Sequence, residues 1–185
     1  MKLLIVIDMQ NDFISGALAN YKGAEVKAAV LDKLANWDGL VAATRDTHDI
    51  DYLETQEGKK LPVTHCIKGT KGWKMDKDID KALVKFTKQF SNGLSNWLGY
   101  FDKDTFGSKK LTDVLWNLNN SGYKFDEIEL CGLVSSICVM ANAVLLKTAF
   151  PEMPITIDSK CTAGLSPEDS EAALVVFKDL QINVI

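Results

Sequence analysis

Two residues that directly follow apolar runs could carry acid–base and nucleophilic chemistry. Asp8 comes immediately after the apolar run 3–7, and a carboxylate held against apolar walls can act as a general base. Cys138 lies in the first turn of a helix expected over 136–150. There the helix dipole favours the thiolate and lowers its pKa, and free backbone N–H groups could hold an oxyanion. Taken alone, however, such an acid is more often a loop cap, and a helical cysteine more often belongs to the core.

The other three cysteines lack that placement. Cys131 falls inside an expected strand and Cys161 in a loop-like segment, while Cys66 directly follows His65. Adjacent residues rarely point their side chains at one another, so we do not expect a Cys66–His65 pair. Because no two cysteines have CxxC spacing, the sequence predicts four free thiols rather than a disulfide framework.

A possible metal site follows the second buried apolar run. Asp46 and His48 are separated by one residue, and in an extended chain residues i and i+2 face the same way. A carboxylate and an imidazole on one side supply two ligands for a divalent ion. His65 is the only other histidine and could be the third ligand, with Glu57 or Glu54 in the intervening loop as a fourth. A DxH pair alone is a common accident, so this pattern needs further support.

Composition excludes several classes of function. The chain has 185 residues, 25 acidic and 21 basic, for a formal net charge of −4, which argues against a nucleic-acid surface built from clustered Lys and Arg. An apolar content of 46% excludes disorder as the dominant state. The sequence predicts a single domain over 1–185, with no signal peptide and no membrane span, and therefore a cytoplasmic location.

The apolar pattern predicts an α/β fold. Expected strands are 3–7, 40–44, 127–133, 155–157 and 182–185, with a less regular one near 83–86, and expected helices are 24–37, 108–118, 136–150 and 167–180. Strands that are apolar on both faces and alternate with helices indicate a three-layer α/β/α arrangement around a mostly parallel sheet. In such sheets the site lies at the carboxyl ends of the strands. The segments 8–13, 45–48 and 134–138 should therefore converge.

Five sequence blocks in this order resemble one known family. They are VIDMQNDF (6–13), TRDTH (44–48) with LPVTHCIKGT downstream (61–70), KDTFGS (103–108), GLVSSICV (132–139) and CTAGLSPE (161–168). Together they resemble the cysteine hydrolase branch of the isochorismatase-like superfamily, of the nicotinamidase type. No single block would suffice, but the set covers nearly the whole chain. The resemblance implies the isochorismatase-like fold.

The resemblance implies a triad of Asp8, Lys103 and Cys138. Asp8 would take the thiol proton and Lys103 would stabilise the thiolate, which attacks an amide carbonyl to form a thioester. The stretch before Lys103 is longer than expected and contains Lys88 as an alternative. We prefer Lys103 because Phe-Gly-Ser follows shortly after it.

By the same resemblance, backbone N–H groups of Val134 and Cys138 would hold the oxyanion. A cis peptide bond is expected before Ser135.

The resemblance also implies a small-molecule amide substrate, with hydrolysis of nicotinamide to nicotinate and ammonia as the leading activity. One divalent ion, zinc first and iron or manganese as alternatives, would be held by Asp46, His48, His65 and Glu57 and would bind the ring nitrogen. The residues expected to contact the substrate are Phe13, Gln10 and Trp73. We expect no nucleic-acid or membrane partner, and a homo-oligomer.

Other functions remain open from the sequence. A related cysteine hydrolase could act on another small amide or a carbamoyl compound, and such a relative need not carry the metal. The ether-hydrolase branch fits less well because we expect it to lack the cysteine nucleophile. A non-catalytic member of the fold is a different class, against which the intact triad argues.

Overall fold

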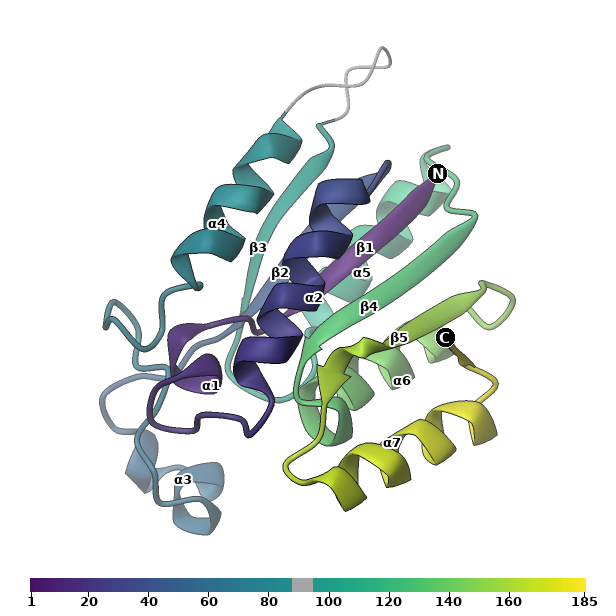
Figure 1. Ribbon diagram of the computed structural model, residues 1–185. Helices are drawn as coiled ribbons and strands as arrows, with labels where there is room; N and C mark the ends of the chain where they lie inside the picture. Colours follow the sequence, from purple (N-terminus) through teal and green to yellow (C-terminus); the bar gives the residue numbers. More distant parts are fainter. Residues whose placement is uncertain (88–94) are drawn as a thin grey trace.

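The computed structural model describes residues 1–87 and 95–185 and contains one six-stranded sheet (Figure 1). The strand order is β3-β2-β1-β4-β5-β6, and every pairing between neighbours is parallel. The strands are β1 (Lys2–Ile7), β2 (Leu40–Asp46), β3 (Trp97–Lys103), β4 (Glu127–Leu133), β5 (Ile155–Ala163) and β6 (Asn183–Val184). The predicted α/β fold with a mostly parallel sheet is confirmed.

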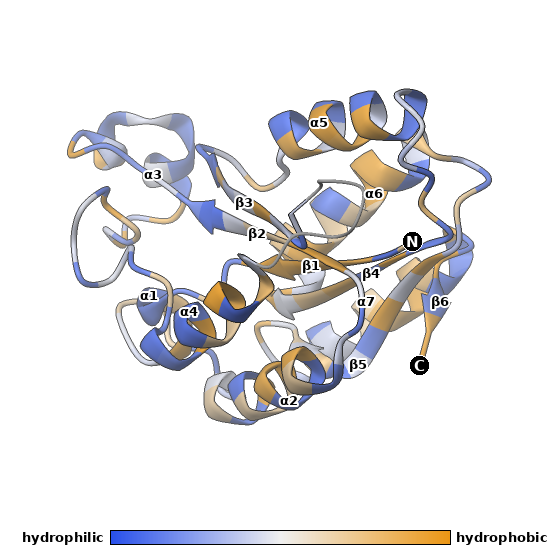
Figure 2. Cartoon of the chain, turned by 90° about the horizontal axis from the view of Figure 1, so that it is seen from above, coloured by the Kyte–Doolittle hydropathy of each residue, from blue (hydrophilic) through white to orange (hydrophobic). Residues whose placement is uncertain are grey.

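Helices cover both faces of this sheet and give the three predicted layers (Figure 2). The helices α2 (Gly23–Asn36) and α4 (Lys77–Val84) pack on one face, and α5 (Lys109–Asn120), α6 (Met140–Ala149) and α7 (Pro167–Asp179) pack on the other. The sequence of β1 is a continuous apolar run because alternate residues of this strand enter two separate cores, one on each face of the sheet. Within 1–87 and 95–185, none of the helices is both long and apolar enough to span a bilayer.

The prediction of a strand near residues 83–86 is wrong. This segment is the end of α4, followed by a 3-10 turn over Lys85–Thr87. The helix begins where the Asp76 side chain accepts hydrogen bonds from the backbone N–H groups of Asp78 and Ile79. Ile79 and Leu83, four residues apart, are then buried on one helix face. The outer strand is instead β3, further along the chain.

Other boundaries differ more modestly from the predictions. The helix predicted over 136–150 begins as a π-helical turn, η3 (Ser135–Val139), and continues as α6. Strand β5 runs six residues beyond the predicted end, and β6 is two residues long. The N-caps of α5 and α7 are Ser108 and Ser166, whose hydroxyl groups accept hydrogen bonds from backbone N–H groups in the first turn of each helix.

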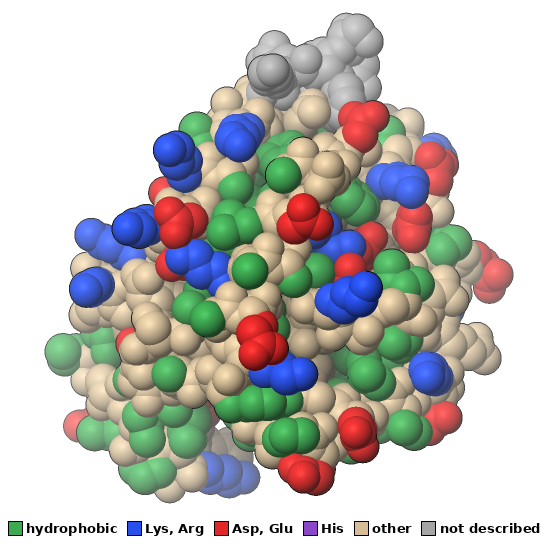
Figure 3. Space-filling model, in the orientation of Figure 1, with side chains coloured by type: hydrophobic (Ala, Val, Ile, Leu, Met, Phe, Trp, Pro, Cys, Tyr) green, Lys and Arg blue, Asp and Glu red, His purple; other side chains and the backbone are tan. Residues whose placement is uncertain are grey.

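Short helical elements lie beyond the carboxyl end of the sheet (Figure 1). They are α1 (Asn11–Ile14), the 3-10 turn η1 (Tyr52–Glu54) and α3 (Gln56–Lys60). The face seen in Figure 3 carries basic and acidic side chains together with apolar ones. All four cysteines are free, as predicted.

Gly132 allows strands β1 and β4 to approach closely just before the site. Its φ is +118°, and a Cβ atom there would lie 2.0 Å from the carbonyl oxygen of Ile7. Any side chain at this position would push apart the two strand ends that precede Asp8 and Cys138.

We expect Gly132→Ala to lower the free energy of unfolding by about 3 kcal/mol or more, because it adds a backbone collision to backbone strain. Chemical denaturation measures the effect. Gly122→Ala is the matched control, since Gly122 also has positive φ (+100°) but open space around it, and should cost about 1 kcal/mol. Equal losses in the two variants would contradict the argument.

Candidate active site

A cavity of about 380 Å³ opens at the carboxyl end of the sheet. Its wall combines Phe13 from α1, Asp46 from the end of β2, and Val134 and Cys138 from the turn after β4. The three segments that the sequence predicted to converge therefore do so. Glu57 and His65 complete the polar part of the wall.

The carboxyl ends of four strands, β1 to β4, bring a lysine, two carboxylates and a thiol together beside this cavity. Lys103 ends β3 and pairs in register with Asp46 of β2. Its ammonium nitrogen lies 2.7 Å from Oδ2 of Asp8, 3.2 Å from Oδ1 of Asp46 and 3.7 Å from Sγ of Cys138. The other carboxylate oxygen of Asp8 accepts a 2.6 Å hydrogen bond from the hydroxyl group of Thr44. The alternative lysine, Lys88, lies outside the described residues.

Burial decides the protonation of this cluster. Asp8, Lys103 and Cys138 are all buried. Burial raises the pKa of Asp8, although the Lys103 ammonium opposes the shift. Burial acts in the opposite direction on Lys103, but the negative charge of Asp8, that of the Cys138 thiolate once it forms, and that of Asp46 outweigh burial and raise the pKa of the lysine. Lys103 is therefore a permanent cation.

The pKa of Cys138 is raised well above 9.0, primarily because the thiol is buried. Lys103 lowers it, but the carboxylates of Asp8 and Asp46 raise it further. The expectation that the helix start lowers this pKa is therefore wrong. The resting thiol is neutral, and a reaction must remove its proton as the sulfur attacks.

The turn after β4 contains the cis peptide bond, between Leu133 and Val134. The predicted position before Ser135 is one residue too late. The strand ends at Leu133, and Val134, the next residue, is the extended N-cap of η3. Within the described parts of the chain, the carbonyl group of Val134 accepts hydrogen bonds from the N–H groups of Ile137 (3.2 Å) and Val139 (3.1 Å). Ser135 is buried, and its hydroxyl group has no partner among these residues.

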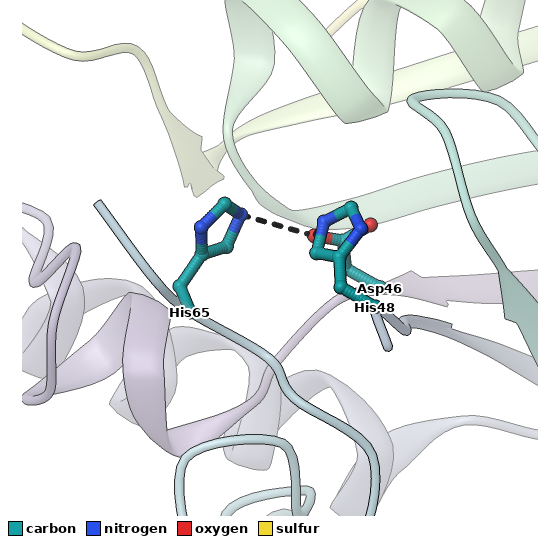
Figure 4. A group of neighbouring side chains, drawn as sticks. All are labelled: Asp46, His48 and His65. Carbon is teal, nitrogen blue, oxygen red and sulfur yellow. Dashed lines mark hydrogen bonds and ion pairs between the residues drawn. The ribbon is translucent and has the colours of Figure 1, made fainter. Parts of the chain in front are cut away.

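Asp46, His48 and His65 form a compact group whose candidate ligand atoms lie within 4.8 Å of one another (Figure 4). The Nε2 atoms of His48 and His65 are 3.0 Å and 3.3 Å from Oδ2 of Asp46. The Nδ1 atom of His65 is 2.8 Å from the carbonyl oxygen of Val63, which orients the ring and leaves Nε2 for a ligand. Two imidazoles and a carboxylate with open space beside them fit a divalent ion such as zinc, iron or manganese.

Asp46 is held ionised, as a metal ligand must be. Burial would raise its pKa, but hydrogen bonds with His48 and His65 and the charge of Lys103 outweigh burial and hold the pKa below its usual range. Glu57 stands slightly apart, with Oε1 3.8 Å from Nε2 of His48, so it could complete the ligand set directly or through water.

Among the three expected substrate contacts, the structure places one in the cavity. Phe13 lines it and packs edge-on against His65, with ring centroids 5.7 Å apart. Gln10 does not line it: its buried amide accepts from the N–H of Asp46 (2.7 Å) and donates to the carbonyl groups of Asp46 (2.8 Å) and Trp73 (2.7 Å). Gln10 therefore fixes the backbone of Asp46.

Trp73 also lies away from the cavity. Its indole N–H donates to the hydroxyl group of Thr47 (2.8 Å), and the Cζ atom of Arg45 lies 4.2 Å from the centroid of its ring. Neither Gln10 nor Trp73 lines this cavity, and in this structure their polar groups bond to other protein groups.

Two further residues support the site and were not predicted. Thr44 orients Asp8, and its position two residues before Asp46 on the same strand could have indicated a shared face. Tyr52 packs against both imidazoles, with ring centroids 4.5 Å from His48 and 4.9 Å from His65. No spacing in the sequence points to Tyr52.

Comparison with known proteins agrees with this geometry. The isochorismatase domain model matches residues 2–185. The nicotinamidase of Saccharomyces cerevisiae is 28% identical over 218 residues, covering 100% of this chain and 99% of the relative. The nicotinamidase/pyrazinamidase of Mycobacterium tuberculosis is 27% identical over 192 residues, covering 100% and 98%. The crystal structure of the Bacillus subtilis nicotinamidase/pyrazinamidase superposes with a TM-score of 0.78 at 27% identity, covering 99% and 98%.

The raised thiol pKa gives a testable pH dependence. We expect iodoacetamide to modify Cys138 first among the four cysteines, because it alone of them lines the cavity. Its rate should be low at pH 7 and still be rising above pH 9, since only the thiolate reacts. Peptide mass spectrometry after timed labelling measures the rate, with denatured protein as the control. A rate that reaches its plateau below pH 8 would show a depressed pKa.

Proposed function

The chain belongs to the isochorismatase family, whose domain model spans it almost entirely, and from this membership we propose that it is a nicotinamidase. It would hydrolyse the amide bond of nicotinamide to give nicotinate and ammonia. The observation that carries the proposal is the contact of Lys103 with both Asp8 and Cys138, where Cys138 lines a cavity whose wall also includes Asp46 and His65. Full-length relatives that are nicotinamidases support it.

In the proposed first step, Asp8 accepts the proton of the Cys138 thiol while the sulfur attacks the amide carbon. The raised pKa of Asp8 makes its carboxylate a stronger base than an exposed aspartate. Lys103, 3.7 Å from the sulfur, stabilises the negative charge until the C–S bond has formed. Thr44 keeps the carboxylate in place through its 2.6 Å hydrogen bond.

The tetrahedral intermediate then collapses. The N–H groups of Val134 and Cys138 would donate to its oxyanion. Asp8 returns the proton to the leaving nitrogen, so that the C–N bond breaks and ammonia departs, leaving a thioester on Cys138. Asp8 next takes a proton from water, which attacks the thioester. The C–S bond breaks, nicotinate leaves, and the thiol regains its proton.

Asp46, His48 and His65 would hold one divalent ion, with Glu57 as a further ligand or bound through water. When bound, the ion supplies a Lewis acid for the ring nitrogen of the substrate. Zinc is our first choice, and iron or manganese would suit the same mixed ligands. This metal group favours a nicotinamidase over related amide or carbamoyl hydrolases that lack one. Phe13, edge-on to His65, would pack against the ring.

Two broader predictions accompany this function. A cytoplasmic location is supported by the four free thiols. A homo-oligomer stays a prediction.

We expect Cys138→Ala to reduce ammonia release from nicotinamide by about a thousandfold or more, because the nucleophile is lost. An enzyme-coupled ammonia assay measures it. Cys161→Ala is the control, since Cys161 is buried outside the cavity, and it should retain activity. If Cys138→Ala stays within tenfold of the parent, the nucleophile is assigned wrongly.

The metal site is tested separately. His48→Ala and chelation should both remove a stoichiometric divalent ion, measured by elemental analysis, and raise KM for nicotinamide more than they slow alkylation of Cys138. Glu54→Ala should keep its metal, because Glu54 lies in the same loop but is exposed. The idea fails if the parent carries no stoichiometric ion, or if His48→Ala shows unchanged KM and kcat.

A further inference from the structure

The cavity is larger than nicotinamide requires. A closed protein cavity of about 150 Å³ holds benzene, with six non-hydrogen atoms, so nicotinamide with nine needs about 225 Å³ by the same proportion. The cavity measures about 380 Å³. It therefore leaves space for a further group about the size of a second ring.

The surplus space is bordered by apolar side chains. The polar groups of the wall, Asp46, Glu57 and His65, come from the end of β2 and the loop after it. Leu61, Phe106 and Leu165 also line the cavity, yet they are 38%, 45% and 61% exposed. Side chains that both line a cavity and reach solvent lie where it opens. We call these three residues the apolar rim.

Three separate connecting segments build the apolar rim. Leu61 follows α3, Phe106 precedes α5, and Leu165 precedes α7. Large apolar side chains exposed together at the mouth of a cavity mark a surface that a ligand covers. No lysine or arginine lines the described cavity wall, so an anionic group seated against the apolar rim would lose its hydration without meeting a cationic side chain.

The chemistry of the substrate decides which atom points at this space. With the carboxamide at Cys138 and the ring nitrogen toward the polar wall, ring carbon 3 and the nitrogen are the two anchored positions, and ring carbons 2, 4 and 6 are each bonded to at least one of them. Carbon 5 is bonded to neither. A substituent there leaves the reacting groups undisturbed and extends into the remaining volume.

We propose that the site binds and hydrolyses pyridine-3-carboxamides that carry an uncharged apolar substituent on ring carbon 5, with that substituent seated against the apolar rim. The proposal rests on the nicotinamidase function proposed above and extends its substrate class. Leu165 and Phe106 are then specificity-determining residues. A fully buried methylene group strengthens binding about fourfold, so a propyl group that is about half covered by the partly exposed rim should strengthen it about tenfold.

The test separates binding from turnover. In Cys138→Ala, calorimetry gives Kd for nicotinamide, 5-propylnicotinamide and 5-carboxynicotinamide. We expect the propyl compound to bind about tenfold more tightly than nicotinamide, and the carboxylate at least tenfold more weakly. In the parent enzyme, kcat/KM for the propyl compound should equal or exceed that for nicotinamide.

Rim variants identify the contact. In the Cys138→Ala background, Leu165→Ala and Phe106→Ala should each bring the ratio of the propyl and nicotinamide Kd values toward one. Val175→Ala, an exposed apolar residue on α7 outside the cavity, should leave the ratio unchanged. The proposal is overturned if the propyl compound binds no more tightly than nicotinamide, if the parent hydrolyses it tenfold less efficiently, or if both rim variants keep the full ratio.

The two proposals fail in different ways. If the parent hydrolyses no nicotinamide while the binding ratios come out as expected, the catalytic proposal falls and apolar-rim recognition stands. If nicotinamide is hydrolysed but the propyl group gives no advantage in binding, the substrate class is wrong and the nicotinamidase proposal stands.

Discussion

The arrangement depends on one buried cation between two carboxylates. Lys103 has almost no contact with solvent, and its ammonium group lies 2.7 Å from Asp8 and 3.2 Å from Asp46. Removing three charges from water is unfavourable unless they compensate one another. Each carboxylate therefore helps to keep the lysine charged, and the lysine allows two acids to share a small volume. Because Asp46 also contacts both imidazoles, the nucleophilic group and the candidate metal site share one carboxylate.

The parallel sheet makes this cluster possible. Asp46 and Lys103 are the last residues of β2 and β3, and Asp8 directly follows β1. Register places Asp46 opposite Lys103, so the charges meet without support from a long loop. Gln10 then fixes the backbone of Asp46 on both its N–H and its carbonyl group. Strand ends are rigid, and this rigidity is what positions groups for proton transfer over short distances.

The sequence was informative wherever a local pattern carried a physical cause. The continuous apolar runs indicated strands buried on both faces. The expectation that sites lie at the carboxyl ends of parallel strands correctly predicted that Asp46 and Cys138 line one cavity. Prediction from the sequence failed where contacts with distant parts of the chain decide a pKa or the secondary structure of a segment. The pKa of Cys138 depends on burial, on Lys103 and on two carboxylates that follow or end other strands, and none of these can be identified from the residues next to Cys138. Likewise, α4 forms because Asp76 caps it and its apolar face packs against the core beside α2, although its sequence is short and ambiguous.

The residues of the cavity wall come from two kinds of segment, strand ends and connecting loops, and this affects how the ligand preference of this fold could change. The reacting groups sit at strand ends, or in the turn directly after one, whereas Leu61, Phe106 and Leu165 belong to three separate connecting segments. Such segments tolerate substitution far better than strands in a packed core. Changes in what the protein recognises can therefore accumulate one segment at a time, while the charged cluster stays intact. In this molecule, the reacting groups and the apolar rim lie in different parts of the chain.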